Sequence, residues 1–462
     1  MFTNLTLAAL LALAPAAPAA LTAHAAPSEP DDLTTSDVSF RTGDGITLGG
    51  TVFAPRGASG GLPALLLVHG SGTGGPGFRK QLRGEAEAFA RQGIVVLAPD
   101  KRQDGYSPFQ RDFAQLADDA LAAFAVLRAR PEVDPAKAGI WGLSEGGWVV
   151  PVAAAKSPDV KFAVLAAGSG VSPIRQQSWN VANKFAWSGI GGSLSRTFPT
   201  TWQRMVADAG MFGGAHHDPV PVLRNVKQPL LALWGAEDAA VPPAESAEIV
   251  RDTLSEAGNH HYTIRFIPDA PHAMHRSDPQ GKRLPDLMPG YADAVGDWVD
   301  AVTSGNPPRA VVEPLPRQEN RSSEVTPSAW WESAPVQFGV LGLFVLLFGA
   351  YPVLALLRRR RAGTWPARVA VVAGVVGSLG TVGYLSTLMF SLTANGIEAG
   401  PLLGDRPVVW LALQLVAVAA VVATVLLAVR WRASTDRLRH GLVLAGGVLF
   451  VPWALYWGLL LP

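Results

Sequence analysis

Residues 139–147 carry the pattern that most directly predicts how this chain folds, Gly139-Ile140-Trp141-Gly142-Leu143-Ser144-Glu145-Gly146-Gly147. It begins with a short strand-like run, continues into a G-x-S-x-G pattern, and is followed by a helical pattern over residues 148–155. The glycines around Ser144 leave room for a sharp turn in which the serine takes a strained backbone conformation. The stretch therefore predicts a strand, a tight turn and a helix, with the Ser144 hydroxyl projecting from the turn.

Short apolar runs alternate with helical patterns on both sides of this turn. The strand-like runs cover 64–69, 94–98, 162–167, 230–234 and 262–267, and the helical patterns cover 79–92, 113–128 and 289–302. Buried strands separated by helices are typical of a mostly parallel sheet with helices on both faces. Residues 37–53 predict an antiparallel hairpin in front of it. The expected fold class is therefore α/β.

An insertion at about 171–228 interrupts this alternation. It contains a set of large apolar side chains, namely Trp179, Phe185, Trp187, Phe198, Trp202, Met205 and Phe212. A long insertion of this kind usually forms a cap over a site. Its aromatic side chains are equally compatible with a small core of the cap itself and with contacts to a ligand.

An acid and a histidine follow the next two strand-like runs. The run at 230–234 leads into Glu237-Asp238, and the run at 262–267 leads into His272. A serine nucleophile needs an imidazole that takes its proton and a carboxylate that holds the imidazole tautomer. The chain order predicts a catalytic triad of Ser144, Asp238 and His272. Glu237 competes with Asp238 for the role of the acid, and His275 competes with His272.

A glycine-rich loop follows the strand-like run at 64–69, with the sequence His69-Gly70-Ser71-Gly72. Backbone N–H groups in such a tight loop can face the nucleophile and stabilise a developing oxyanion, together with the N–H of Glu145. The run over 70–77 lacks the Gly-Lys-Ser/Thr ending of a phosphate-binding loop, so we do not interpret it as one.

These motifs resemble the α/β-hydrolase superfamily, in particular bacterial dienelactone-hydrolase-like and serine-aminopeptidase-like esterases. The resemblance covers residues 37–305 and rests on His69-Gly70-Ser71-Gly72, on Asp100-Lys101-Arg102, and on the GxSEGG turn at 142–147. It implies the α/β-hydrolase fold, the triad Ser144, Asp238 and His272, and oxyanion donors at Ser71 and Glu145. The sequence departs from the family pattern at Gln103, where the family has glycine. The resemblance indicates a reaction type better than a substrate.

The N-terminal residues 1–25 have the pattern of a secretory signal peptide. An uncharged Ala/Leu run over 5–21 is followed by Ala23-His24-Ala25, which is an A-x-A cleavage pattern. A positively charged segment before the apolar run is missing, so a short uncleaved anchor is the alternative. Residues 26–305 then form the predicted hydrolase domain.

Four apolar runs follow a Pro-, Ser- and charge-rich linker at 306–334. They cover about 336–357, 367–392, 407–429 and 441–461 of a region at 335–462. Each is long enough to cross a membrane as a helix. Because these runs carry no charged residue near their centres, they favour an anchor or a partner-binding bundle over a transporter. A row of glycines in the second run (Gly374, Gly377, Gly380 and Gly383) indicates close helix contacts or tolerance of lipid.

The arginines of this region predict its orientation. Nine arginines flank the first and third loops between the runs, whereas the middle loop has Arg406 alone. Short loops rich in arginine stay in the cytoplasm. We therefore expect a multi-pass protein of the cell membrane, with the hydrolase domain on the extracytoplasmic side.

The composition excludes several other classes of function. The chain has 38 basic and 37 acidic residues among 462, which gives no support for a nucleic-acid-binding protein. It has no cysteine, which excludes disulfides, cysteine-ligated metals and a thiol nucleophile. The histidines show no metal-binding spacing, so we expect neither a metal nor an organic cofactor.

The expected function is that of a membrane-anchored serine hydrolase that cleaves a carboxylic ester or related acyl bond through an acyl-enzyme. Peptidase, thioesterase or acyltransferase activity on the same residues stays open, and a substrate ammonium near Glu145 would favour an aminopeptidase. The alternative from another class is a non-catalytic membrane scaffold or sensor that retains the fold. The expected partners are a small acyl substrate and the lipid bilayer, and the oligomeric state stays open.

Overall fold

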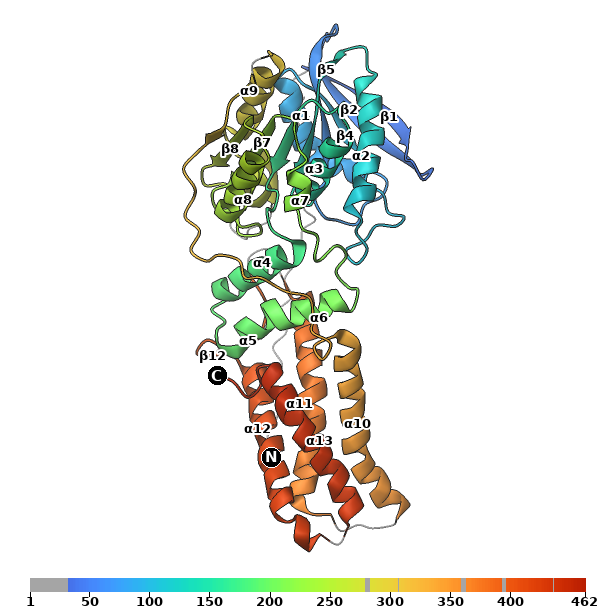
Figure 1. Cartoon of the computed structure of the whole chain (residues 1–462), viewed down its shortest axis with the longest axis vertical. Coiled ribbons are helices and arrows are strands. Elements are labelled where there is room, and N and C mark those ends of the chain that lie inside the picture. Colours follow the sequence, from blue (N-terminus) through green and yellow to red (C-terminus); the bar gives the residue numbers. More distant parts are fainter. Residues whose placement is uncertain (1–31, 279–282, 306, 359–362, 393–395, 435) are drawn as a thin grey trace, which may run out of the picture.

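The computed structural model describes residues 32–462, apart from 279–282, 306, 359–362, 393–395 and 435. The predicted signal peptide at 1–25 lies outside the described residues. Figure 1 shows three parts along the long axis of the molecule: a sheet flanked by helices, a layer of shorter helices, and a bundle of long helices.

The central sheet has nine strands in the order β1-β2-β4-β3-β5-β6-β7-β8-β11. The strands are β1 (Leu33–Arg41), β2 (Thr47–Pro55), β3 (Leu62–Val68), β4 (Val95–Pro99), β5 (Val133–Leu143), β6 (Ala163–Ala166), β7 (Leu230–Gly235), β8 (Tyr262–Ile267) and β11 (Val311–Val312). The hairpin β1–β2 is antiparallel and joins β4 in antiparallel fashion, and all neighbours from β4 onward are parallel. This arrangement confirms the predicted α/β class.

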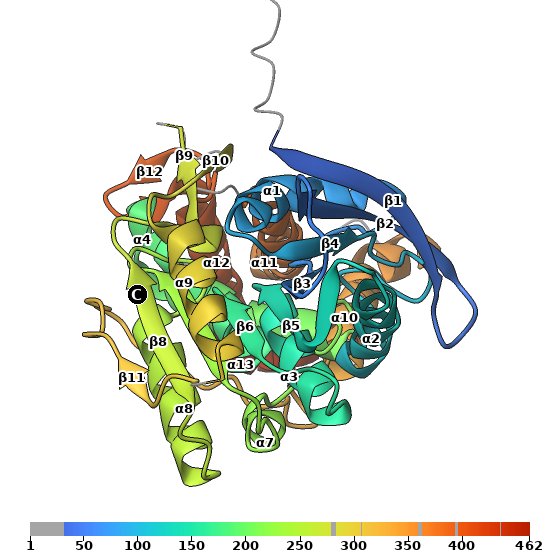
Figure 2. The same ribbon diagram turned by 90° about the horizontal axis from the view of Figure 1, so that it is seen from above.

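Helices cover both faces of this sheet (Figure 2). One face carries α1 (Arg83–Arg91) and α9 (Tyr291–Thr303), and the other carries α2 (Phe113–Arg128), α3 (Gly146–Lys156) and α8 (Pro243–Glu256). Helix α2 begins where the Asp112 side chain accepts the N–H groups of Ala114 and Gln115. The central strands are apolar throughout because both of their faces are buried.

Two segments differ from the sequence prediction. The helix expected at 79–92 begins as a 3-10 turn at Phe78–Leu82 and becomes α-helical only from Arg83. The segment expected as a linker at 306–334 contributes β11, which pairs in parallel with β8 through Val311 and Thr263. A run of two strand residues carries no periodic signal, so sequence patterns did not reveal this edge strand.

The predicted cap consists of α4 (Pro173–Trp187), α5 (Gly192–Thr197), a π-helical turn at Phe198–Trp202, α6 (Gln203–Asp208) and α7 (Val220–Leu223). Helices α4, α5 and α6 lie between the sheet and the bundle (Figure 1). Phe185 stacks on Phe198 at 5.4 Å between ring centroids, and Trp202 lies 6.2 Å from Trp457 of the bundle end. Phe185, Phe198 and Trp202 therefore belong to a core that the cap shares with the C-terminal helices, whereas Trp187 is exposed.

The bundle contains α10 (Ala334–Leu357), α11 (Trp365–Phe390), α12 (Val408–Val429) and α13 (Arg437–Tyr456). All four helices are long and apolar enough to cross a membrane. A Cβ atom added to Gly374 would lie 2.4 Å from Phe348, and one added to Gly380 would lie 2.9 Å from Leu413. These glycines therefore serve close helix contacts, whereas Gly383 faces open space.

Candidate active site

Ser144 lies at the turn between β5 and α3, as the sequence predicts. Its φ of 53° is in the left-handed region, which a residue with a side chain rarely adopts. A Cβ atom on Gly142 would lie 2.4 Å from the Gly146 carbonyl oxygen, and one on Gly146 would lie 2.7 Å from the Val68 carbonyl oxygen. The G-x-S-x-G pattern is therefore a steric requirement of this turn.

The structure brings Ser144, His272 and Asp238 together. The Nε2 atom of His272 lies 3.1 Å from the Ser144 Oγ, and its Nδ1 atom lies 2.8 Å from the Asp238 Oδ2. Because a carboxylate only accepts hydrogen bonds, Nδ1 carries the proton and Nε2 is left to accept the serine hydroxyl. Asp238 is held by the N–H groups of Ala240 and Val241, which its Oδ1 accepts at 2.8 and 2.9 Å.

The loop that carries His272 is itself strained. Asp269, Ala273 and Met274 all have positive φ angles, between 54° and 67°. Residues held in this region cost free energy and cluster at functional sites. The side chain of His272 is 30% exposed, whereas that of Asp238 is fully buried. The His272 imidazole therefore lines the cavity on one side and is held by the buried Asp238 carboxylate on the other.

His275 and Glu237, the two residues that compete for triad roles in the sequence, do not contact Ser144 or His272 in the described contacts. The buried His275 has its Nε2 atom 2.9 Å from the Glu85 Oε1, and its Nδ1–H donates to the Leu284 carbonyl oxygen. Asp238, and not Glu237, is the carboxylate next to His272. Glu237 instead lines a neighbouring cavity.

The glycine-rich loop after β3 lies against the nucleophile. Ser71, Ser144, Glu145 and His272 line one cavity of about 370 Å³. A Cβ atom on Gly70 would lie 3.4 Å from the Ser144 Cβ. The structure therefore places the backbone around Ser71 beside the serine, where the sequence predicts an oxyanion donor.

A buried charge cluster joins this loop to the Ser144 turn. The Lys101 ammonium donates to the Gly70 carbonyl oxygen at 2.8 Å, to the Tyr106 hydroxyl at 2.8 Å and to the Glu145 Oε1 at 2.5 Å. Arg111 approaches the other Glu145 oxygen at 3.2 Å. The Glu145 carboxylate is thus already surrounded by two cations, which argues against its binding a substrate ammonium.

Burial shifts the pKa values of two members of this cluster, Lys101 and Tyr106. Burial lowers the pKa of Lys101, while the Glu145 charge acts in the opposite direction. Burial and then the Glu145 charge raise the pKa of Tyr106, so its hydroxyl stays protonated. Sequence reasoning missed this cluster because its members lie on separate segments and share no spacing pattern.

Lys101→Met is expected to lower the free energy of unfolding by about 3 kcal/mol, because Glu145 would stay buried with one cation fewer. The two side chains are 6% and 1% exposed, so water cannot replace the lost partner. The double variant Lys101→Met/Glu145→Gln removes the stranded charge and should recover part of the loss. Denaturant unfolding of the full chain in detergent micelles measures both, and a double variant no more stable than the single one would contradict this assignment.

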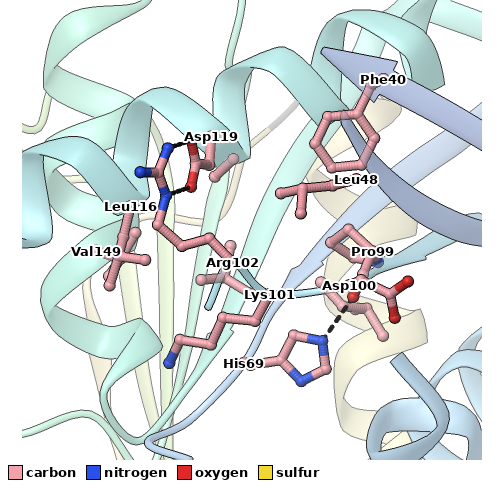
Figure 3. Close-up of a pocket in the computed structure, with 13 residues that line it drawn as sticks. Phe40, Leu48, His69, Pro99, Asp100, Lys101, Arg102, Leu116, Asp119 and Val149 are labelled. Atoms are coloured by element: carbon pink, nitrogen blue, oxygen red, sulfur yellow. Dashed lines mark hydrogen bonds and ion pairs between the residues drawn. The ribbon is translucent and has the colours of Figure 1, made fainter. Parts of the chain in front are cut away.

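A second, smaller cavity is lined by His69, Lys101 and Arg102 and is shown in Figure 3. Arg102 forms a bidentate pair with Asp119 and also contacts Asp44. The Nε2–H of His69 donates to the Pro99 carbonyl oxygen at 2.7 Å, and burial lowers the pKa of His69 to about 3. At about 40 Å³ the cavity has room for about one water molecule, so these residues support the site and do not form it.

Gln103, which stands where the family pattern has glycine, does not prevent the glycine-rich loop from bonding to the backbone of Lys101. The Gly75 N–H donates to the Lys101 carbonyl oxygen at 2.8 Å, and a Cβ atom on Gly75 would lie 2.8 Å from the Gln103 side chain. Gln103 therefore packs against the glycine-rich loop where the family pattern has glycine. Gly75 has a φ of 104°, which glycine adopts without strain.

Two cavities meet at His272. The cavity at Ser144 shares Asn180, Ala240 and His272 with a larger one of about 890 Å³. The first cavity is also lined by Gln203 of the cap, whose side chain is fully buried. Neither the amide nitrogen nor the amide oxygen of Gln203 has a hydrogen-bond partner among the described residues. An unpaired buried amide is costly, so Gln203 is a candidate for contact with a bound polar group.

Part of the chain is similar in sequence to known proteins. Residues 80–289 match the model of the Prolyl oligopeptidase family. A polyketide transferase of Penicillium crustosum is 33% identical over 135 residues, which are 28% of this chain and 42% of that protein. A putative carboxymethylenebutenolidase of Methylorubrum extorquens is 26% identical over 215 residues, 46% of this chain and 60% of that protein. The chain therefore spans about half the length of these curated relatives.

Among solved structures, a putative dienelactone hydrolase from Klebsiella pneumoniae matches with a TM-score of 0.37 and 20% identity, covering 52% of this chain and 88% of that one. The family match spans the segment that carries Ser144, Asp238 and His272. That segment folds as parallel strands with helices on both faces, and its serine stands on a strand–turn–helix. The chain therefore has the α/β-hydrolase fold and continues into four helices apolar enough to cross a membrane.

Proposed function

We propose that this chain is a membrane-anchored serine hydrolase that cleaves a carboxylic ester or a related acyl bond. One observation carries the proposal, namely that His272 bridges the Ser144 hydroxyl and the buried Asp238 carboxylate at 3.1 and 2.8 Å. Such an arrangement activates a serine hydroxyl, which is otherwise a weak nucleophile.

The proposed reaction has two halves that share a covalent acyl-enzyme. The Ser144 Oγ attacks the acyl carbon while the His272 Nε2 takes its proton, and Asp238 stabilises the resulting imidazolium. The bond to the leaving oxygen then breaks as His272 returns the proton to that oxygen. Water next attacks the acyl carbon and gives a proton to His272. His272 passes this proton to the Ser144 oxygen as the acyl bond breaks, which releases the carboxylic acid and restores Ser144. The N–H groups of Ser71 and Glu145 would stabilise the oxyanion in each half.

Transfer of the acyl group to an acceptor other than water is the second candidate. It uses the same acyl-enzyme, and the polyketide transferase of Penicillium crustosum is among the relatives with the highest identity reported above. Aminopeptidase activity is less well supported, because Lys101 and Arg111 already surround the Glu145 carboxylate that would bind a substrate ammonium.

Reaction of the full chain with a fluorophosphonate probe tests the proposed function. The probe should label one serine, identified as Ser144 by peptide mapping, and should abolish hydrolysis of p-nitrophenyl esters in parallel. A chain that takes up no probe and hydrolyses no ester would instead be the non-catalytic scaffold or sensor. Measuring the carboxylic acid released when no acceptor other than water is present separates the two activities, because only hydrolysis releases the acid under these conditions.

We further propose that the hydrolase domain lies on the extracytoplasmic side of the cell membrane. The four helices α10 to α13 would form an even number of spans, so both the start of α10 and the end of α13 lie at the end of the bundle next to the cap (Figure 1). Arg358, Arg368, Arg430 and Arg437 border the loops at the opposite end of the bundle. Arginine-rich loops resist translocation, so that end is assigned to the cytoplasm.

Reporter fusions to the full chain should follow this topology. A fusion after Leu461 or at Gly400 is expected to read as extracytoplasmic, and a fusion at Ser434 as cytoplasmic, because the arginines gather beside Ser434. Paired alkaline phosphatase and green fluorescent protein reporters give opposite signals on the two sides. A cytoplasmic reading from a fusion at residue 300 would overturn the proposed sidedness.

A further inference from the structure

One wall of the Ser144 cavity comes from a helix of the bundle. Met389, the penultimate residue of α11, lines the same cavity as Ser144 and His272. Met389 lies 245 positions after Ser144 in the chain, so this contact depends on how the bundle packs against the hydrolase domain. The candidate site is therefore completed by a part of the chain that we assign to the membrane.

The cap holds the bundle end in a fixed position. Ser193 of the cap accepts a hydrogen bond from the Trp410 Nε1–H at 3.1 Å, and the Gly191 N–H donates to the Asp405 carbonyl oxygen at 2.8 Å. Arg196 donates to the carbonyl oxygen of Pro462 at 2.7 Å. Together with the shared aromatic core, these contacts join the cap and the bundle in one packed unit.

Exposed aromatic side chains indicate the level of the membrane surface. Trp330 is 79% exposed just before α10, and Phe390 is 87% exposed at the end of α11. Trp365 is exposed at the other end of α11. Large aromatic residues gather at both surfaces of a bilayer, because their rings are apolar and their edges tolerate water. Met389, next to Phe390, therefore lies at the level of the lipid headgroups.

The two cavities that meet at His272 differ in how many charged side chains line them. The lining of the Ser144 cavity combines polar side chains, among them Gln176, Asn180 and Gln203, with a group of apolar side chains from the cap, the bundle and one loop, namely Phe109, Val206, Met211, Phe212 and Met389. The larger cavity has charged side chains, including Glu237, Asp269, Arg276 and Arg283. Because His272 returns the proton to the leaving group, the leaving group belongs on the His272 side, toward the charged cavity. The acyl chain then belongs in the apolar part.

We propose that the substrate is an amphiphilic ester with a long acyl chain, taken from the bilayer surface at the cap end of the bundle. The apolar side chains beside Ser144 and Met389 would receive the acyl chain, and the charged cavity would receive the polar leaving group. The cavity volume of about 370 Å³ is within the range of small-molecule sites. This inference rests on the proposed serine hydrolase and adds the class of its substrate.

Chain-length selectivity of the full chain in phosphatidylcholine nanodiscs tests this inference. The measured quantity is the ratio of turnover of p-nitrophenyl dodecanoate to that of p-nitrophenyl acetate. Met389→Trp fills the cavity wall and is expected to lower this ratio about tenfold or more, as lost contacts with a hydrophobic pocket do. The matched control Phe390→Trp places the same bulk on the neighbouring exposed residue and should keep the ratio within about twofold.

The outcomes separate this inference from the proposed function. A wild-type chain that takes up no fluorophosphonate and hydrolyses neither ester would overturn both. A chain that takes up the probe but hydrolyses both esters equally, with a ratio that Met389→Trp does not change, would overturn the substrate class alone. If Met389→Trp fails to fold, Met211→Trp changes a cap residue that lines the same cavity, and it is expected to lower the same ratio.

Discussion

Ser144→Ala is expected to lower ester hydrolysis by about 10⁴-fold or more, as removal of the nucleophile does in serine hydrolases. The hydroxyl it removes is the group that His272 contacts at 3.1 Å. The fold should persist, because the Ser144 N–H still donates to the Ala166 carbonyl oxygen and alanine is smaller than serine. Initial rates with p-nitrophenyl acetate measure the loss, and fluorophosphonate labelling should disappear with it.

Ser157→Ala is the matched control for this experiment. Ser157 follows the other end of α3, where its hydroxyl oxygen accepts only the Asp159 N–H among the described contacts. Its removal should leave the rate within about twofold, as surface substitutions usually do. Turnover of Ser144→Ala above about one percent of wild type would mean that another group is the nucleophile.

The sheet could be predicted from the sequence because its strands are buried on both faces. Ala64–Leu67 and Leu230–Trp234 are fully buried and apolar without interruption. Each therefore appears in the sequence as an apolar run that is too short for a helix and has the length of a strand. The carboxyl ends of parallel strands meet at one edge of a sheet. Ser144, Asp238 and His272 each follow such an end, which is why chain order alone was enough to bring them together as a hypothesis.

Contacts between distant segments could not be predicted in the same way. Lys101 and Glu145 form a buried pair across 44 positions, and neither residue stands in a repeating pattern that points to the other. The cap aromatics had two explanations in the sequence, a separate core or a ligand site. The structure shows both uses, because Trp202 packs against Trp457 in a core shared with the bundle, whereas Phe212 lines the Ser144 cavity. Composition gives the class of a buried side chain and leaves its partner undetermined.

The second large effect is expected for Asp238→Asn, which should lower kcat by about 10⁴-fold, the loss seen when an orienting carboxylate becomes an amide. The surroundings of Asp238 explain the size of this loss. Its Oδ1 accepts the N–H groups of Ala240 and Val241, so the asparagine oxygen must occupy that position. The amide NH₂ then faces the His272 Nδ1 and forces that atom to accept. The ring proton moves to Nε2, which can no longer take the proton of Ser144.

Glu237→Gln is the matched control, because it removes the same charge from the adjacent residue. Glu237 lines the larger cavity, and the carboxylate bonded to His272 belongs to Asp238. We therefore expect the Glu237→Gln rate to stay within about tenfold of wild type, a loss that a cavity-lining charge can account for. Initial-rate kinetics of both variants decide between the two acids. If Glu237→Gln lost more activity than Asp238→Asn, the carboxylate that orients His272 during turnover would be Glu237, and the hydrogen bond at 2.8 Å would be a contact of the resting enzyme alone.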